Sequence, residues 1–192
     1  MKKILTVCLM LSFVFVFSCA SGGGGAAQVT GELFPGTWEW EVENDANDGG
    51  TSTIEMIDNG DGSRTFKGTV TNKYQYGMGS VTLKPDAATL EKLKVAKAIK
   101  FKMQSVEGKA YIAEACLSSV TDWGFHQRIL RTNPGEAMDF HLQFKSFIQP
   151  PWGTQKRFNT ELLTHIRILT KNAAEGGLGD YEFKVWDFAL EL

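Results

Sequence analysis

From residue 34 onward, apolar and polar residues alternate along most of the chain. The clearest example is AIKFKMQ, residues 98–104, where Ile, Phe and Met alternate with Lys and Gln. A period of two predicts strands that bury one face and expose the other. Asn-Gly and Asp-Gly pairs such as those in 58–63 supply turns between alternating segments. The pattern predicts about ten strands. The clearest ones cover residues 53–57, 64–71, 79–84, 98–106, 110–117, 125–132, 138–147, 163–171 and 180–192, and Trp38 and Trp40 lie on a further strand pattern.

Two segments depart from simple alternation. Residues 85–96 have helical spacing after Asp86, a good N-cap residue, so one short helix is expected. In 180–192 the apolar phase changes near Val185, which predicts a bulge or a strand covered on both faces. The fold class is therefore all-β: a two-sheet antiparallel β-sandwich, most simply a jelly roll, with at most one short helix.

The first residues resemble a bacterial export signal. Lys2 and Lys3 precede an uncharged apolar run, residues 4–17, that is too short to span a bilayer comfortably. Residues 16–19, Val-Phe-Ser-Cys, are similar to a lipobox, which implies that Cys19 is diacylated and becomes the N-terminus. The alternative is ordinary signal cleavage without a lipid.

A run of glycines follows, and Gly-rich segments are flexible tethers. The expected organisation is a lipoprotein signal peptide over 1–18, a tether over 19–33 and a binding domain over 34–192. The expected location is the cell envelope of a diderm bacterium, where a lipid anchors the protein at the outer membrane, at the periplasmic face or on the cell surface.

Composition narrows the function classes. The formal net charge is −2 with both signs interspersed, so nucleic acid is not an expected partner. After export Cys116 would be the only cysteine besides Cys19, which leaves no disulfide framework. Cys116 lies in an apolar strand pattern, which favours a small buried residue over a nucleophile.

Several segments, in this order, resemble the complex I intermediate-associated protein family. They are WEWEVENDANDGGTSTIEM, FKGTVT, YQYGMGSV, AMDFHLQFKSFIQPPWG and the closing LLTHIRILTKNAAEGGLGDYEFKVWDFAL. That family is similar to family 11 carbohydrate-binding modules and to galactose-binding-domain-like jelly rolls. The resemblance therefore implies a non-catalytic binding domain. Residues 74–79 depart from the family pattern, so no ligand contact is carried over.

Sugar recognition needs aromatic faces for stacking and planar polar groups for hydroxyls. Loop aromatics next to glycine and polar strand positions are the candidates, and the alternatives are aromatic plugs of the sandwich ends and an ordinary solvated sheet face. The candidate ligand-binding residues are Tyr74, Tyr76, Trp123, His126, Arg128 and Trp152. The pairs His141 with Gln143 and His165 with Arg167 also occupy polar strand phases.

A structural calcium ion is a further hypothesis. Asp45, Asp48 and Asp187 resemble the positions at which jelly-roll modules join the N-terminal region to the last strand through an ion. Carboxylate oxygens are suitable calcium ligands. The alternative is that these carboxylates cap turns.

The sequence contains no nucleophile elbow, P-loop or dinucleotide motif, so an enzyme is not favoured. The first hypothesis is a lipid-anchored domain that binds a carbohydrate. The second is an envelope assembly or structural protein that binds another protein.

Overall fold

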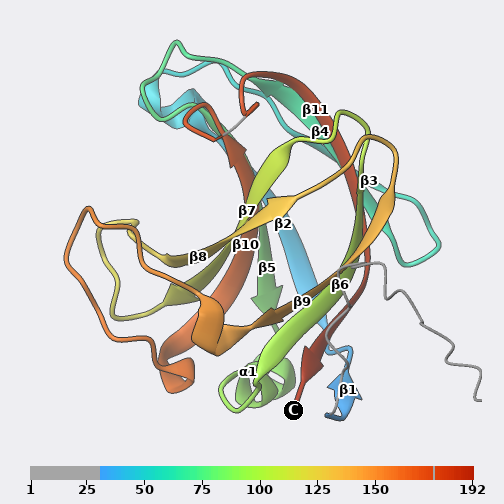
Figure 1. Ribbon diagram of the computed structural model, residues 1–192, viewed down its shortest axis with the longest axis vertical. Helices are drawn as coiled ribbons and strands as arrows, with labels where there is room; N and C mark the ends of the chain where they lie inside the picture. Colours follow the sequence, from blue (N-terminus) through green and yellow to red (C-terminus); the bar gives the residue numbers. More distant parts are fainter. Residues whose placement is uncertain (1–30, 175) are drawn as a thin grey trace, which may run out of the picture.

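The computed structural model describes residues 31–174 and 176–192, and these form two antiparallel sheets packed face to face (Figure 1). The predicted all-β sandwich with one short helix is thus confirmed. Cys19, the signal peptide and nearly all of the tether lie outside the described residues. Within the described part, no helix is long and apolar enough to cross a membrane.

The sheets contain all eleven strands of the described residues. In sheet A the order is β3 (Glu55–Asp58), β4 (Arg64–Val70), β11 (Gly179–Glu191), β6 (Ala98–Ser105) and β9 (Ala137–Gln143), and β1 (Leu33–Phe34) pairs with the end of β11. In sheet B it is β2 (Trp38–Asn44), β5 (Met78–Pro85), β10 (Leu163–Lys171), β7 (Ala110–Leu117) and β8 (His126–Arg131). Short 3-10 helices cover Asp45–Asp48, Phe144–Ser146 and Thr160–Leu162.

The core lies between the sheets and follows the predicted alternation. Ile99, Phe101 and Met103 on β6 are fully buried, as is Phe66 on β4. The buried cluster draws on both sheets and lies wholly within residues 31–192. A chain that starts at Ala26 therefore contains every element and every core residue that the structure describes, and a domain that folds independently needs such a core of its own.

The one α-helix of the described residues, α1 (Ala87–Leu93), begins where the sequence predicts it. The Asp86 carboxylate accepts a hydrogen bond from the Thr89 backbone N–H at 2.8 Å, which satisfies one of the free N–H groups of the first turn. Leu93 is buried on the core side of the helix. One capped turn and one buried apolar side are therefore enough to fix α1 at the edge of the sandwich.

The phase change in β11 is a bulge. The register against β6 shifts between Trp186 and Ala189, and Asp187 there has a left-handed φ of 54°. Such a bulge adds a residue to one strand and moves the following side chains to the other face. Val185 and Phe188 are therefore both buried, while Asp187 points outward to an ion pair with Lys102 at 3.1 Å.

The outer face of sheet B, the one turned away from sheet A, is partly covered. On β10, Ile166 and Ile168 belong to the core, so Arg167 between them points outward, level with Glu114 of β7. Every residue of β7 is buried. A strand of a two-layer sandwich would otherwise expose the side chains on its outer face, so additional chain must lie over this face of β7.

Candidate ligand-binding face

A buried ion-pair network occupies the centre of the outer face of sheet B. Arg167 is only 4% exposed, and its guanidinium donates to Glu114 Oε2 at 3.3 Å and to Glu43 Oε2 at 3.2 Å. It also donates to Ser80 Oγ at 3.1 Å. These partners come from β7, β2 and β5, so Arg167 joins four neighbouring strands. A forked guanidinium suits such a set because its donors have a fixed planar geometry.

Burial sets the electrostatics of this network. It raises the pKa of Glu114, and the Arg167 guanidinium partly opposes this by favouring the carboxylate. Glu43 keeps an accessible side chain at the rim. The network therefore presents ordered polar groups in which one cation, Arg167, is paired with two carboxylates.

Trp123 lies over this network. The Arg167 guanidinium carbon is 5.7 Å from the centroid of the Trp123 ring, while 62% of the Trp123 residue surface remains exposed. Phe125 meets the Trp123 ring edge-on at 6.2 Å and the His165 ring at 6.3 Å. The segment after β7 thus returns over the sheet and holds an aromatic ring above a buried cation, an arrangement with favourable cation–π attraction.

His165 lies beside Arg167 on the same face. Burial, followed by the nearby Arg167 and Lys84 cations, lowers the pKa of His165 to about 4. Its Nδ1 is 2.8 Å from the Thr164 hydroxyl. The imidazole is therefore uncharged at neutral pH and acts as a polar group with one donor and one acceptor nitrogen.

The structure brings the two candidate tryptophan loops together. Asp122, next to Trp123, accepts a hydrogen bond from the Thr154 backbone N–H at 2.6 Å through Oδ2. Trp152 belongs to that second loop and is 51% exposed. The loop is closed by the buried Gln149, whose amide donates to the Thr154 carbonyl at 3.0 Å. Trp123 and Trp152 consequently project from adjoining turns.

Tyr74 and Tyr76 lie in the β4–β5 loop, at the other end of β10. Their rings meet edge-on at 5.7 Å, and Tyr76 is 65% exposed. Met78, which follows this loop, has its sulfur 3.8 Å from Arg167 Nη2. Among the described residues no ring contact joins the tyrosines to Trp123, so we place the tyrosines at the margin of the face.

His126 and Arg128 require a correction. Pairing of β8 with β7 places His126 opposite Ala115, a core residue, and His126 is buried edge-on against Phe158 at 5.1 Å. The strand phase predicted for His126 is therefore wrong. Arg128 shares that phase and is exposed only because β8 is an edge strand, where it donates to the Ser146 carbonyl. Neither residue joins Arg167 on the outer face.

Of the three candidate calcium ligands, Asp45 and Asp48 share the 3-10 helix after β2, and Asp187 lies far from both. Asp45 is buried and accepts bonds from the Ser52 N–H and hydroxyl at 2.8 and 2.7 Å. The Ser52 hydroxyl in turn accepts from the Thr71 N–H, next to where β4 meets Gly179 of β11. Asp187 is eight residues further along β11, roughly 26 Å at strand rise. Residues 31–174 and 176–192 contain no cluster of three or more potential metal-ligating side chains.

The Arg167–Glu114 pair was not among the site residues expected from the sequence. His165 and Arg167 were recognised as polar positions, but Glu114 lies in the apolar segment YIAEACL, which reads as a core strand. A signal was nevertheless present, because a carboxylate in a buried strand needs a partner. Arg167, on another strand pattern, is such a partner, but only the strand order shows that the two meet.

Similar proteins agree with this architecture. One solved structure, the family 11 carbohydrate-binding module of the cellulosomal cellulase Lic26A-Cel5E of Clostridium thermocellum, is 15% identical, with 86% of this chain and 96% of that chain covered and a TM-score of 0.57. The family 11 module from Clostridium thermocellum in complex with a β-1,3-1,4-mixed-linked tetrasaccharide is 18% identical, covers 86% and 97% and has a TM-score of 0.54. At this identity the likeness shows the fold alone.

Comparison with curated proteins finds no match. The family model of complex I intermediate-associated protein 30 (CIA30), in contrast, matches residues 34–190. This range starts in β1 and ends one residue before the end of β11, so it spans both sheets. The chain belongs to the complex I intermediate-associated protein 30 family.

Proposed function

We propose that this protein is a non-catalytic, lipid-anchored envelope protein that binds a carbohydrate on the outer face of sheet B. The observation that carries the proposal is the Trp123 ring, which is widely exposed yet held over the buried Arg167 network. An exposed aromatic face suits the CH face of a sugar ring, and adjacent ordered polar groups suit its hydroxyls. The anchor rests on the lipobox-like residues 16–19.

Two further features support a sugar ligand. Uncharged hydroxyls need donors and acceptors rather than a free charge. The neutral His165 has one of each, and the charge of Arg167 is already matched by carboxylates. A solved structure of the same fold holds a mixed-linked tetrasaccharide. The exposed Trp152 and Tyr76 would extend the contact beyond one sugar ring.

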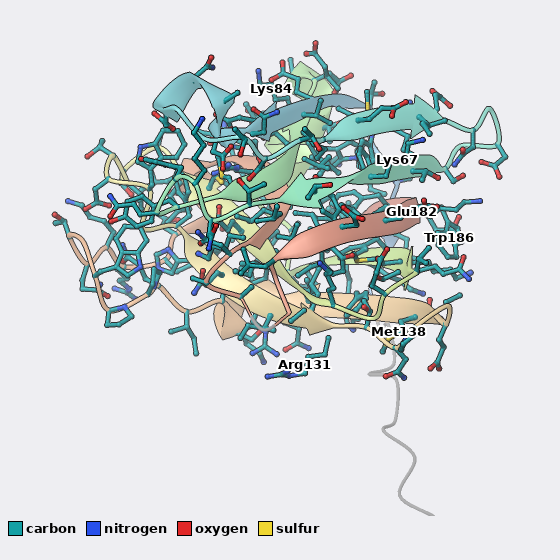
Figure 2. The ribbon with its side chains drawn as sticks, turned by 90° about the horizontal axis from the view of Figure 1, so that it is seen from above. Lys67, Lys84, Arg131, Met138, Glu182 and Trp186 are labelled. Carbon is teal, nitrogen blue, oxygen red and sulfur yellow. The ribbon has the colours of Figure 1, made fainter. Side chains whose placement is uncertain are left out.

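The test is a titration of residues 26–192 with a panel of oligosaccharides and polysaccharides, followed by tryptophan fluorescence. We expect a saturable change that Trp123→Ala abolishes. Trp186→Phe is the matched control, because Trp186 lies on sheet A, on the same side of the molecule as Lys67 and Glu182 (Figure 2). Equal responses from Trp123→Ala and the unchanged protein would contradict the proposed face.

A protein partner is the second candidate function, favoured by a separate observation. Ile129 and Ile148 are exposed, and Ile148 pairs with Gln127 of β8, two residues from Ile129. Exposed apolar side chains that lie close together are typical of protein interfaces. If the oligosaccharide panel gives no response, crosslinking from position 148 in native envelopes, compared with position 106 at exposed Val106, tests this candidate.

A further inference from the structure

We infer that Asp122 is a positioning residue that locks Trp123 and Trp152 into one fixed pair. This rests on the proposed carbohydrate face for its functional meaning, although the contacts themselves do not. Asp122 lies between the two tryptophan turns and bonds to both. Its Oδ2 accepts from the Thr154 N–H at 2.6 Å, and its Oδ1 faces the Gly124 N–H at 3.3 Å.

The backbone on the Trp123 side needs such a restraint. Trp123 has a φ of 63°, in the left-handed region that side chains other than glycine rarely adopt. Residues hold such conformations only when the surroundings enforce them. The carboxylate of Asp122 on one side and the ring contacts of Trp123 with Arg167 and Phe125 on the other supply that enforcement.

The Trp152 side is built around the same carboxylate. Gly153 has a φ of 79°, and a Cβ there would come within 2.8 Å of Asp122 Oδ2, so the chain passes directly against the carboxylate. A Cβ on Gly124 would meet Asp122 Oδ1 at 3.2 Å and the Trp152 carbonyl oxygen at 3.4 Å. The approach of the two turns therefore requires glycine at position 153, and a side chain at position 124 would be tight.

The Gln149 side-chain amide holds the loop that carries Trp152 in shape. Its Oε1 accepts from the Lys156 N–H at 2.6 Å, while its Nε2 donates to the Thr154 carbonyl. The second loop is thus closed by its own hydrogen bonds, and the Asp122 carboxylate joins it to the Trp123 turn. The Thr154 N–H bond, the main cause, also lowers the pKa of Asp122, so the carboxylate remains ionised and able to accept both bonds in mildly acidic conditions.

The functional consequence concerns ligand geometry. Two aromatic rings select a ligand by their spacing and relative tilt, and rings on loosely held loops lose that selectivity and affinity. The binding of a sugar chain that contacts both Trp123 and Trp152 would then depend on Asp122, although Asp122 does not contact the sugar. Without Asp122 the two rings would move independently of each other.

The experiment compares Asp122→Ala with Asp139→Asn, a control that removes an exposed carboxylate on β9, in the 26–192 chain labelled with ¹⁵N. We expect Asp122→Ala to move or broaden the indole N–H signals of Trp123 and Trp152. The signals of Trp38, Trp40 and Trp186 should remain in place in both variants. If the indole N–H signals of Trp123 and Trp152 are the same in Asp122→Ala as in the unchanged protein, the inference is overturned.

Affinity is the second measurement, with the first oligosaccharide of the panel that the unchanged protein binds. Asp122→Ala should bind it about tenfold more weakly, comparable with the loss of one hot-spot side chain. Changed indole signals with unchanged affinity would overturn the positioning role. If no oligosaccharide binds the unchanged protein, the proposed function fails, while the indole signals still decide whether Asp122 fixes the pair. Should Asp122→Ala not fold, Asp122→Asn keeps the shape but loses one acceptor oxygen.

Discussion

Arg167 is the residue on which the outer face of sheet B most depends. Replacement by Met would leave Glu114 buried without its cation, and breaking one partner of a buried pair costs about 3–5 kcal/mol. We expect urea unfolding of Arg167→Met to show a loss of that order. The control Lys84→Met removes a cation from the exposed pair with Glu41 and should cost far less. Equal losses in the two variants would contradict the structural role of the network.

His165 makes stability depend on pH in a defined window. Its pKa is about 4 in the folded chain against 6.5 as the ordinary value, so the folded state disfavours the proton. Stability is therefore complete above pH 6.5 and falls as the pH drops from 6.5 to about 4. Allowing for partial solvent screening, the loss is on the order of 1–2 kcal/mol.

The measurement is the free energy of unfolding of wild type and His165→Gln between pH 7 and 4. Burial also lowers the pKa of His126, which adds a slope of the same sign in both proteins. The difference between the two curves isolates His165. If the curves run parallel through this window, the imidazole is not as disfavoured in its charged form as the structure indicates.

Among the elements, α1 offers the clearest test of a local signal. Asp86→Ala removes the cap bond to the Thr89 N–H and should lower the Tm by about 3 °C. Asp86→Asn keeps an acceptor oxygen and should lose less. The same hydrogen bond lowers the pKa of Asp86, so its contribution is present above pH 3.8 and is lost as the pH falls below that value.

The control for the helix is Asp48→Ala, which removes an exposed carboxylate from the 3-10 helix after β2. In scanning calorimetry at pH 7, we expect the Tm of Asp48→Ala to be close to that of the unchanged protein. A Tm for Asp86→Ala that matches Asp48→Ala would mean that tertiary packing alone holds α1.

The elements differ in how far their sequences predicted them. Strand β6 was predictable because its inward residues Ile99, Phe101 and Met103 are apolar and alternate with polar residues that point outward. Strand β8 was not, because HQRILR places polar His126 inward and exposed Ile129 outward. At an edge strand the two faces differ less in burial, so alternation is a weak guide to the phase.

At the scale of the whole molecule, the prediction concerns attachment. Cys19→Ser in the full chain, expressed in a diderm bacterium, should stop incorporation of labelled fatty acid and release the protein into the soluble envelope fraction. Cys116→Ser is the matched control, since Cys116 is buried on β7 and should leave labelling unchanged. Labelling that persists in Cys19→Ser would contradict the anchor. The domain itself, residues 31–192, would fold the same way with or without the lipid, because its core is self-contained.

The sequence by itself determined the fold class, most strand positions, the helix at Asp86 and the change of phase in β11, because each depends on residues close together in the chain. It also identified Trp123 and Trp152 as loop aromatics. The tertiary structure alone decided that Glu114, Glu43 and Ser80 surround Arg167, that Trp123 lies over it and that Asp122 joins two loops. Those contacts depend on strand order and on which face each side chain takes, and a linear pattern does not specify either one.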